Sequence, residues 1–203
     1  ADINLKNDSG KTLLSFACSV VQKASMVQSL LDRGVNANEA GKDGSCPIHE
    51  ASKSGSIQIF DKLIQAGASQ SCKDNFGMTP VHYACLSGKV QIFDRLVNDL
   101  KVEINCKNAV GETPFYQLCL EDHDSMELFE RFVEMGAADV NSQNDSGTFM
   151  FHVACQKQLI AMISRFIDLG VNVNMKSQDG ETALFMSCDP PELFEKLIEN
   201  GAD

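Results

Sequence analysis

The run TPVHYAC at residues 79–85 has five relatives in the same chain. They read TLLSFAC at 12–18, CPIHEAS at 46–52, TPFYQLC at 113–119, FMFHVAC at 149–155 and TALFMSC at 182–188. The runs begin at positions 12, 46, 79, 113, 149 and 182, so their spacings are 34, 33, 34, 36 and 33 residues. Self-similarity at a period of about 20 to 50 residues indicates a solenoid, in which stacked copies bury a shared core.

Each copy carries the signals for two helices and a turn. Thr79 before Pro80 is a good helix start, because the hydroxyl can accept a backbone N–H and proline at the first helical position loses no hydrogen bond. The stretches IQIFDKLIQ and VQIFDRLVN then place apolar residues at helical spacing. Gly67 and Gly136 end two of the second helices, and Gly77 lies in a polar turn that leads to the next copy.

A 33-residue unit with a T-P-L-H-x-A signature resembles the ankyrin repeat. The sharpest matches are CPIHEA at 46–51 and TPVHYA at 79–84, and GVNAN at 34–38 resembles the closing G-A-D-x-N element of that family. The resemblance covers nearly the whole chain. It implies an all-α fold, an ankyrin-repeat solenoid of stacked helix-turn-helix units joined by β-hairpin-like turns.

We expect a single domain over 1–203 with six units, at about 7–40, 41–73, 74–107, 108–143, 144–176 and 177–203. Residues 1–6 match the tail of a preceding repeat and the last three match the start of another closing element, so we expect a fragment of a longer array. Unit 5 has Phe-Met at 149–150 in place of Thr-Pro, which predicts a weak helix start. Unit 3 lacks its closing glycine at 99–101, and unit 6 has Asp-Pro-Pro at 189–191 between its helices.

Composition excludes several classes of function. The hydrophobic share of 43% is ordinary for a folded protein, and no apolar run reaches the roughly 18 residues that span a bilayer. We therefore expect no direct membrane insertion, and the opening residues carry no basic-then-apolar leader. The net charge of −11 argues against nucleic acid and predicts a neutral or basic protein partner.

The positions of the eight cysteines favour a packing role. The last place of a run is shared by Cys18, Cys85, Cys119, Cys155 and Cys188. Cys72 and Cys106 stand seven residues before the next run, and Cys46 occupies a first place. Residues that recur once per repeat fill equivalent slots, and no CxxC pair offers the close spacing typical of zinc sites. We expect free and mostly buried thiols, no metal, and a reducing cytoplasmic setting.

The histidines predict structure rather than catalysis. His82 belongs to the repeat signature, and the ankyrin resemblance implies that it ties its helix to neighbouring turns, as do His49 and His152. His123, in EDHD, and the carboxylates of Glu121 and Asp122 are expected in a solvated loop between the helices of unit 4. The chain contains no phosphate-binding, dinucleotide-binding, nucleophile-elbow or kinase motif. We therefore expect no enzyme activity and no cofactor.

Two classes of function remain open. The first is a non-catalytic protein-interaction scaffold that binds a partner on its concave face. The second is the sensing or targeting arm of a larger enzyme, ion channel, toxin or pathogen effector. Neither alternative identifies the partner or the oligomeric state, because one solenoid fold serves unrelated partners.

The ankyrin resemblance implies contact positions in the turn and at the end of the first helix. In unit 2 these are polar, as they are in unit 5 at Asp145, Ser146, Thr148, Gln156 and Lys157. Units 3 and 4 instead supply an apolar group, which consists of Phe76, Met78, Leu86, Val110 and Leu120. Its predicted charged rim is formed by Lys42 and Lys53 on one side and by Glu112 and Glu121 on the other. We expect this group to be the docking site.

Overall fold

The computed structural model describes residues 3, 5–120, 125–186 and 191–203. First helices alternate with second helices along the chain, in the order α1 (Leu13–Cys18), η1 (Val21–Lys23), α2 (Ala24–Asp32), α3 (Pro47–Ser54), α4 (Ile57–Gln65), α5 (Pro80–Leu86), α6 (Val90–Asp94), η2 (Arg95–Asp99), η3 (Tyr116–Cys119), α7 (Met126–Glu134), α8 (Met150–Gln156), α9 (Ile160–Asp168), α10 (Ala183–Met186) and α11 (Pro191–Glu199). Within the described ranges the extended backbone is limited to isolated bridges, so the predicted all-α solenoid is confirmed.

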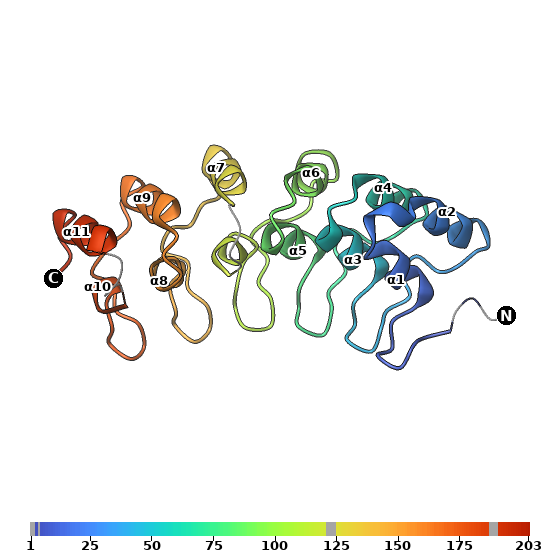
Figure 1. Ribbon diagram of the computed structural model, residues 1–203, viewed down its shortest axis with the longest axis horizontal. Helices are drawn as coiled ribbons and strands as arrows, with labels where there is room; N and C mark the ends of the chain where they lie inside the picture. Colours follow the sequence, from blue (N-terminus) through green and yellow to red (C-terminus); the bar gives the residue numbers. More distant parts are fainter. Residues whose placement is uncertain (1–2, 4, 121–124, 187–190) are drawn as a thin grey trace.

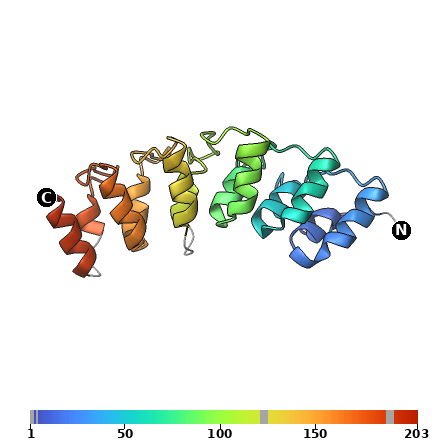
Figure 2. The ribbon, with the colours of Figure 1, turned by 90° about the horizontal axis from the view of Figure 1, so that it is seen from above.

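The elements form three layers along the array. Figure 1 shows the hairpin turns at the lower edge, the first helices above them and the second helices at the top. Each first helix packs on the next, as α1 does on α3 and α3 on α5, and seen from above the row of second helices follows a shallow arc (Figure 2). Every helix pair therefore buries its apolar faces both within itself and against its neighbours.

A chain of phenylalanines joins the cores of units 3 to 5. The ring of Phe93 lies 5.1 Å from that of Phe132, which lies 5.0 Å from Phe115. Phe129 continues the chain to Phe166 at 5.1 Å. Tilted and edge-on pairs at these separations contribute beyond the area that they bury. Phe93 and its counterpart in unit 2, Phe60, were both predicted as core and are 1% and 0% exposed.

The first helices of units 2 and 3 begin with a reciprocal cap. The backbone N–H of Thr79 donates to Nδ1 of His82 at 3.2 Å, and Nε2 of the same ring lies 3.2 Å from the carbonyl oxygen of Glu112. His49 repeats this arrangement, with the Cys46 N–H at 3.0 Å and the Cys72 carbonyl oxygen at 3.1 Å. Each histidine thus ties a helix start to the chain ahead of it, which confirms the predicted structural role.

Unit 5 begins its first helix without this cap. Phe149 stands at the position of Thr79 and makes no side-chain hydrogen bond to the helix start. His152 keeps one contact, from Nε2 to the carbonyl oxygen of Met175 at 3.0 Å, whereas its buried Nδ1 has no partner. The side-chain cap that threonine supplies in unit 3 is therefore missing in unit 5, and the weak helix start stays a prediction.

Units 3 and 4 depart from regular α-helix. The second helix of unit 3 ends in the π-turn η2, and Lys101 adopts φ 55° where other units place glycine. A side chain in this left-handed region costs about 1 to 3 kcal/mol. In unit 4 the first helix is the 3₁₀ segment η3 rather than the expected α-helix. Tyr116 replaces the histidine there, and Thr113 Oγ1 accepts the Tyr116 N–H at 3.2 Å. The joint predicted at 189–191 lies partly outside the described residues.

Neighbouring hairpin turns are locked by backbone hydrogen bonds. The N–H of Ala109 donates to the carbonyl oxygen of Phe76 at 2.8 Å, and the next turn repeats the bond from Asp145 to Val110 at 2.9 Å. Gly77 makes this approach possible, because it has φ 71° and a Cβ there would lie 2.7 Å from the backbone nitrogen of Ala109. The turns consequently form a continuous edge rather than independent loops.

The second helices are linked by a ladder of polar pairs. In each pair a basic side chain reaches back to an acceptor on the preceding second helix. Arg95 Nε lies 2.8 Å from Asp61 Oδ1 of the preceding helix, and Arg165 Nε lies 2.6 Å from Glu130 Oε1. The same rung recurs between Arg131 and Asp94 at 3.3 Å, and between Lys62 Nζ and Gln28 Oε1 at 2.5 Å. Because the ionic rungs are about one-third exposed, each contributes little to stability, but together they fix the register of neighbouring helices.

Candidate functional site

Two of the predicted docking residues stand on adjacent hairpin turns and face solvent. The side chain of Phe76 is 64% exposed and that of Val110 is 51% exposed. The bond from the Ala109 N–H to the Phe76 carbonyl oxygen joins their turns directly. The chain therefore holds two apolar side chains in water on a fixed frame.

The turn that carries Phe76 is anchored by a buried carboxylate. Asp74 is 7% exposed, and its Oδ1 accepts the N–H groups of Phe76 and Met78, both at 2.9 Å. Its Oδ2 accepts the hydroxyl of Tyr83 at 2.6 Å. Burial and this bond to Asp74 raise the pKa of Tyr83. With three donors bound to one carboxylate, the backbone under Phe76 is fixed before any partner arrives.

The neighbouring turn is held in a similar way by amides. Asn108 Oδ1 accepts the N–H groups of Val110 and Glu112, at 3.0 and 2.9 Å. The Glu112 carboxylate in turn accepts from Asn108 Nδ2 at 3.0 Å and from Gln117 Nε2 at 2.9 Å. Glu112, predicted to be a rim charge, is thus half-buried and already hydrogen-bonded within its own unit.

The remaining members of the predicted group differ in exposure. Met78 is 7% exposed, so the expectation that it faces solvent is wrong; its side chain lies against the neighbouring turn, where its sulfur is 3.4 Å from Asn108 Nδ2. Leu86 and Leu120 are half-buried, and Leu120 packs on the core. The rim lysines, Lys42 and Lys53, are exposed. Glu121, together with Asp122 and His123, lies outside the described residues.

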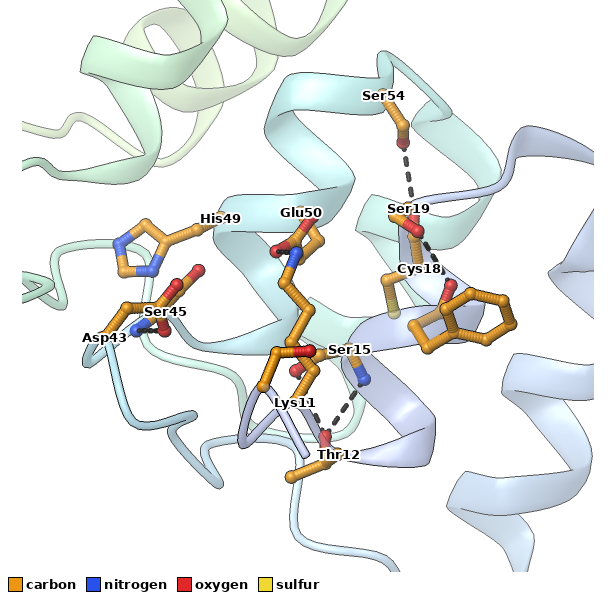
Figure 3. A network of polar contacts seen from close by, with 12 residues as sticks. Lys11, Thr12, Ser15, Cys18, Ser19, Asp43, Ser45, His49, Glu50 and Ser54 are labelled. Atoms are coloured by element: carbon orange, nitrogen blue, oxygen red, sulfur yellow. Dashed lines mark hydrogen bonds and ion pairs between the residues drawn. The ribbon is translucent and has the colours of Figure 1, made fainter. Parts of the chain in front are cut away.

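The equivalent surface of units 1 and 2 is polar and internally paired. Figure 3 shows Lys11 reaching from the first hairpin turn to Glu50 on α3, where Nζ lies 2.5 Å from Oε1. In the same view Ser54 donates to the carbonyl oxygen of Cys18 at 3.0 Å. Because Glu50 is 9% exposed and already paired with Lys11, its carboxylate is not available to a partner.

Two histidines of the repeat signature, His82 and His152, are buried in surroundings that disfavour the charged ring. His82 is 0% exposed, and burial lowers its pKa to about 4. The pKa of His152 is lowered for the same reason. A ring that is buried, uncharged and bonded through both nitrogens, as His82 is, holds the chain together and has no free nitrogen to exchange protons with a substrate.

The described cysteines are free thiols. Five of them are buried, namely Cys18, Cys46, Cys85, Cys119 and Cys155. Cys72 and Cys106 are half-buried, and Cys188 lies outside the described residues. Burial raises the pKa of Cys18 to about 12, so this thiol is inert. The prediction of free and mostly buried thiols is confirmed for the described part of the chain.

One cluster of side chains escaped the sequence analysis. The sulfurs of Cys46 and Cys72 and a ring nitrogen of His49 all lie within 4.8 Å of one another. A thiol hydrogen bond from Cys72, assisted by His49, lowers the pKa of Cys46, and the same interaction raises the pKa of Cys72. The cysteines are distant in sequence, so a search for close spacing could not find them. The usable signal was that Cys46 replaces the usual threonine of the repeat.

Comparisons with known proteins identify the family. A family model described as "Ankyrin repeats (3 copies)" matches residues 1–74, 57–129 and 117–203. The chain is 27% identical to Rabankyrin-5 of Mus musculus over 81% of its length, and 26% identical to NF-kappa-B inhibitor zeta of Mus musculus over 99%. It is 30% identical to ankyrin repeat protein OPG189 of Variola virus over 41% of its length.

The chain spans only a part of these relatives: 14% of Rabankyrin-5, 28% of NF-kappa-B inhibitor zeta and 14% of the Variola virus protein. Each helix among the described residues falls short of the length and apolarity that a bilayer-spanning segment needs.

Proposed function

Because this chain belongs to the ankyrin-repeat family, we propose that it is a non-catalytic interaction scaffold that holds a protein partner on its concave face. Ankyrin repeats generally mediate protein–protein interaction. Among the relatives, the name of NF-kappa-B inhibitor zeta describes an inhibitor of another protein, NF-kappa-B. A partner protein, rather than a small substrate, also fits the buried and neutral state of the signature histidine His82.

The exposed ring of Phe76 is the observation that carries the proposal. The same place in the hairpin turn is occupied by polar residues in four other units, namely Ser9, Asp43, Ser146 and Asp179. The fold therefore does not require an aromatic side chain there. Val110 repeats the exception on the adjacent turn. A few rigid apolar residues at the centre of a polar surface usually supply most of the binding energy of an interface.

The charges around these turns define the class of partner. Exposed Lys42 and Lys53 lie on the side of unit 2, and the acidic residues Glu112 and Glu121 belong to unit 4. With a net charge of −11, the chain favours a neutral or basic protein and disfavours nucleic acid. Its free thiols fit a reducing cytoplasmic setting.

A second candidate function rests on the small share of each relative's length that the chain covers. Since the chain spans 28% or less of the three proteins named above, the scaffold can serve as the sensing or targeting arm of a larger enzyme, ion channel, toxin or pathogen effector. Both candidate functions need the same docking surface. They differ in whether the scaffold works alone or brings the partner to a larger protein of which it is a part.

The test compares two substitutions at equivalent turn positions. Phe76→Asp introduces the residue that unit 2 carries as Asp43, and Ser146→Asp is the matched control in unit 5. Proteins captured by the native chain and by Ser146→Asp, but not by Phe76→Asp, are the expected result. For such a partner, once purified, Phe76→Ala should cost about 2 kcal/mol of affinity, and Lys53→Ala should cost less and mainly alter its salt dependence. Equal capture by all three chains would contradict the proposal.

A further inference from the structure

We propose that Cys46, His49 and Cys72 form a binding site for a soft divalent metal ion, with zinc as the best fit. Two thiols and an imidazole are the ligand types that zinc prefers, and the three donor atoms lie within 4.8 Å of one another. Cys72 Sγ is 3.6 Å from His49 Nε2. A tetrahedral zinc ion, with bonds of about 2.3 Å to sulfur and about 2.0 Å to nitrogen, sets that edge at about 3.5 Å.

The fold holds two of the three ligands before a metal arrives. Cys46 is the N-cap residue that precedes α3 and is 7% exposed, and His49 lies one turn later and is 1% exposed. Cys72 comes from the loop that follows α4 and is half-buried, which gives an ion an entrance from solvent. The three side chains therefore already lie together, and metal binding requires His49 to exchange its two backbone contacts for the ion.

The next unit shows that the fold itself does not need the second thiol. There the equivalent residues are Thr79, His82 and Cys106, and the threonine hydroxyl lies 3.8 Å from the cysteine sulfur. His82 Nδ1 accepts the Thr79 N–H as His49 Nδ1 accepts the Cys46 N–H, but His82 Nε2 faces the carbonyl oxygen of Glu112, whereas His49 Nε2 faces that of Cys72. Within the described part of the chain, a group of three metal-ligating side chains occurs only at Cys46, His49 and Cys72. Unit 3 is thus a built-in reference site with a hydroxyl in place of one thiol.

Metal binding has a defined cost and proton balance. His49 Nδ1 accepts the Cys46 N–H, so the ring proton lies on Nε2, facing the Cys72 carbonyl oxygen. When zinc takes the Nε2 lone pair, that proton moves to Nδ1, the ring stays neutral and both backbone contacts are lost. The two thiols release their protons to solvent as two sulfur–zinc bonds form. Loss of these two buried hydrogen bonds is the main cost of binding, and the two zinc–thiolate bonds have to outweigh it. Water completes the fourth position.

The decisive experiment titrates the reduced, metal-free chain with Zn²⁺ against a chromogenic chelator, and in parallel with Co²⁺, whose thiolate complex absorbs light. We expect one ion per chain and about two protons released per zinc ion. The matched variants are Cys46→Thr, which copies Thr79, and Cys72→Ser, which copies Ser142 at the equivalent place in unit 4. Loss of an outer partner alone weakens metal sites about 10- to 100-fold, so removing a ligand should cost more than about 100-fold.

Two controls make the result specific. Cys106→Ser should bind the ion as the native chain does, because Cys106 is the single thiol of the reference site in unit 3. Thr79→Cys should raise the stoichiometry from one ion to about two, since it completes the same set of ligands in unit 3. Binding that persists in both Cys46→Thr and Cys72→Ser would overturn the proposal. The proposal would also be overturned if Cys46 and Cys72 formed a disulfide and the reduced native chain bound zinc no more tightly than Cys46→Thr and Cys72→Ser do.

Discussion

Helices α5 and α8 occupy equivalent places in units 3 and 5, yet they begin in different ways. In α5, Thr79 and His82 share a hydrogen bond, and both ring nitrogens of the histidine are used. In α8, Phe149 replaces the threonine and the buried Nδ1 of His152 is left without a partner. Both helices nevertheless form and bury their apolar faces. Packing between units therefore builds the helix, whereas the cap sets how firmly it is attached.

The largest expected difference between units 3 and 5 is the loss of stability when the histidine of each unit is replaced by alanine. His82→Ala leaves the Thr79 N–H and the Glu112 carbonyl oxygen buried without partners, so we expect a loss of about 4 kcal/mol in the free energy of unfolding. His152→Ala removes a single hydrogen bond, to Met175, together with the ring contact with Phe149, and should cost about 1 to 2 kcal/mol. Chemical denaturation of both variants measures the difference. Equal losses would show that the cap on α5 adds nothing.

Acid should weaken unit 3 through the same histidine. Burial lowers the pKa of His82 to about 4 in the folded chain, below the unfolded value of about 6.5. The unfolded state therefore binds the proton first, and stability that is complete above about pH 6.5 is lost as the pH falls towards 4. The expected loss from this group is about 3 kcal/mol. The free energy of unfolding, measured at several pH values, should therefore depend less on pH for His82→Ala than for the native chain. An equal pH dependence of the two chains would contradict the assignment.

Restoring the threonine should bring unit 5 closer to unit 3. Phe149→Thr supplies the missing cap and gives His152 Nδ1 a nearby hydroxyl, at the expense of the ring contact between Phe149 and His152. We expect a gain of about 1 kcal/mol, the usual value of a helix cap. Denaturation measures the gain, and hydrogen exchange should show slower opening of α8. A loss of stability would mean that the ring contact matters more than the cap.

The smallest expected difference concerns the residue after each first helix. Gly88 has φ 64° and the equivalent Gln158 has φ 57°, so the glutamine holds a backbone conformation that favours glycine. Gln158→Gly should stabilise the chain by about 0.5 kcal/mol, because relief of strain is partly offset by the greater freedom of glycine when unfolded. The reverse exchange, Gly88→Gln, is the control and should destabilise. Thermal unfolding of the pair decides the sign.

The sequence predicted the features that recur and missed those that depend on one unit. The 33-residue period, the capping role of His82 and the missing cap at Phe149 were all visible as residue types at fixed places. The burial of Met78 was not, because it depends on how its side chain packs against the next turn, where its sulfur meets Asn108 Nδ2. The 3₁₀ form of η3 was not foreseen either; it accompanies the loss of the ring nitrogen at Tyr116.

The candidate sites divide in the same way. The exposure of Phe76 and Val110 could be predicted, since those turn positions are polar in other units. The meeting of Cys46 with Cys72 could not, because it needs the loop after α4 to fold back onto the start of α3. Contacts between distant parts of one repeat leave no spacing signal in a single sequence.

The ladder along the second helices bears on how such an array can lengthen. Asp61 faces forward to Arg95, while the adjacent Lys62 faces back to Gln28, so one helix carries both halves of the linkage. A duplicated copy of α4 placed beside the original would meet a complementary group on either side, Asp61 behind it and Arg95 ahead of it. Duplication at this point therefore keeps these side-chain pairs. An array built in this way can change its length before it changes its surface.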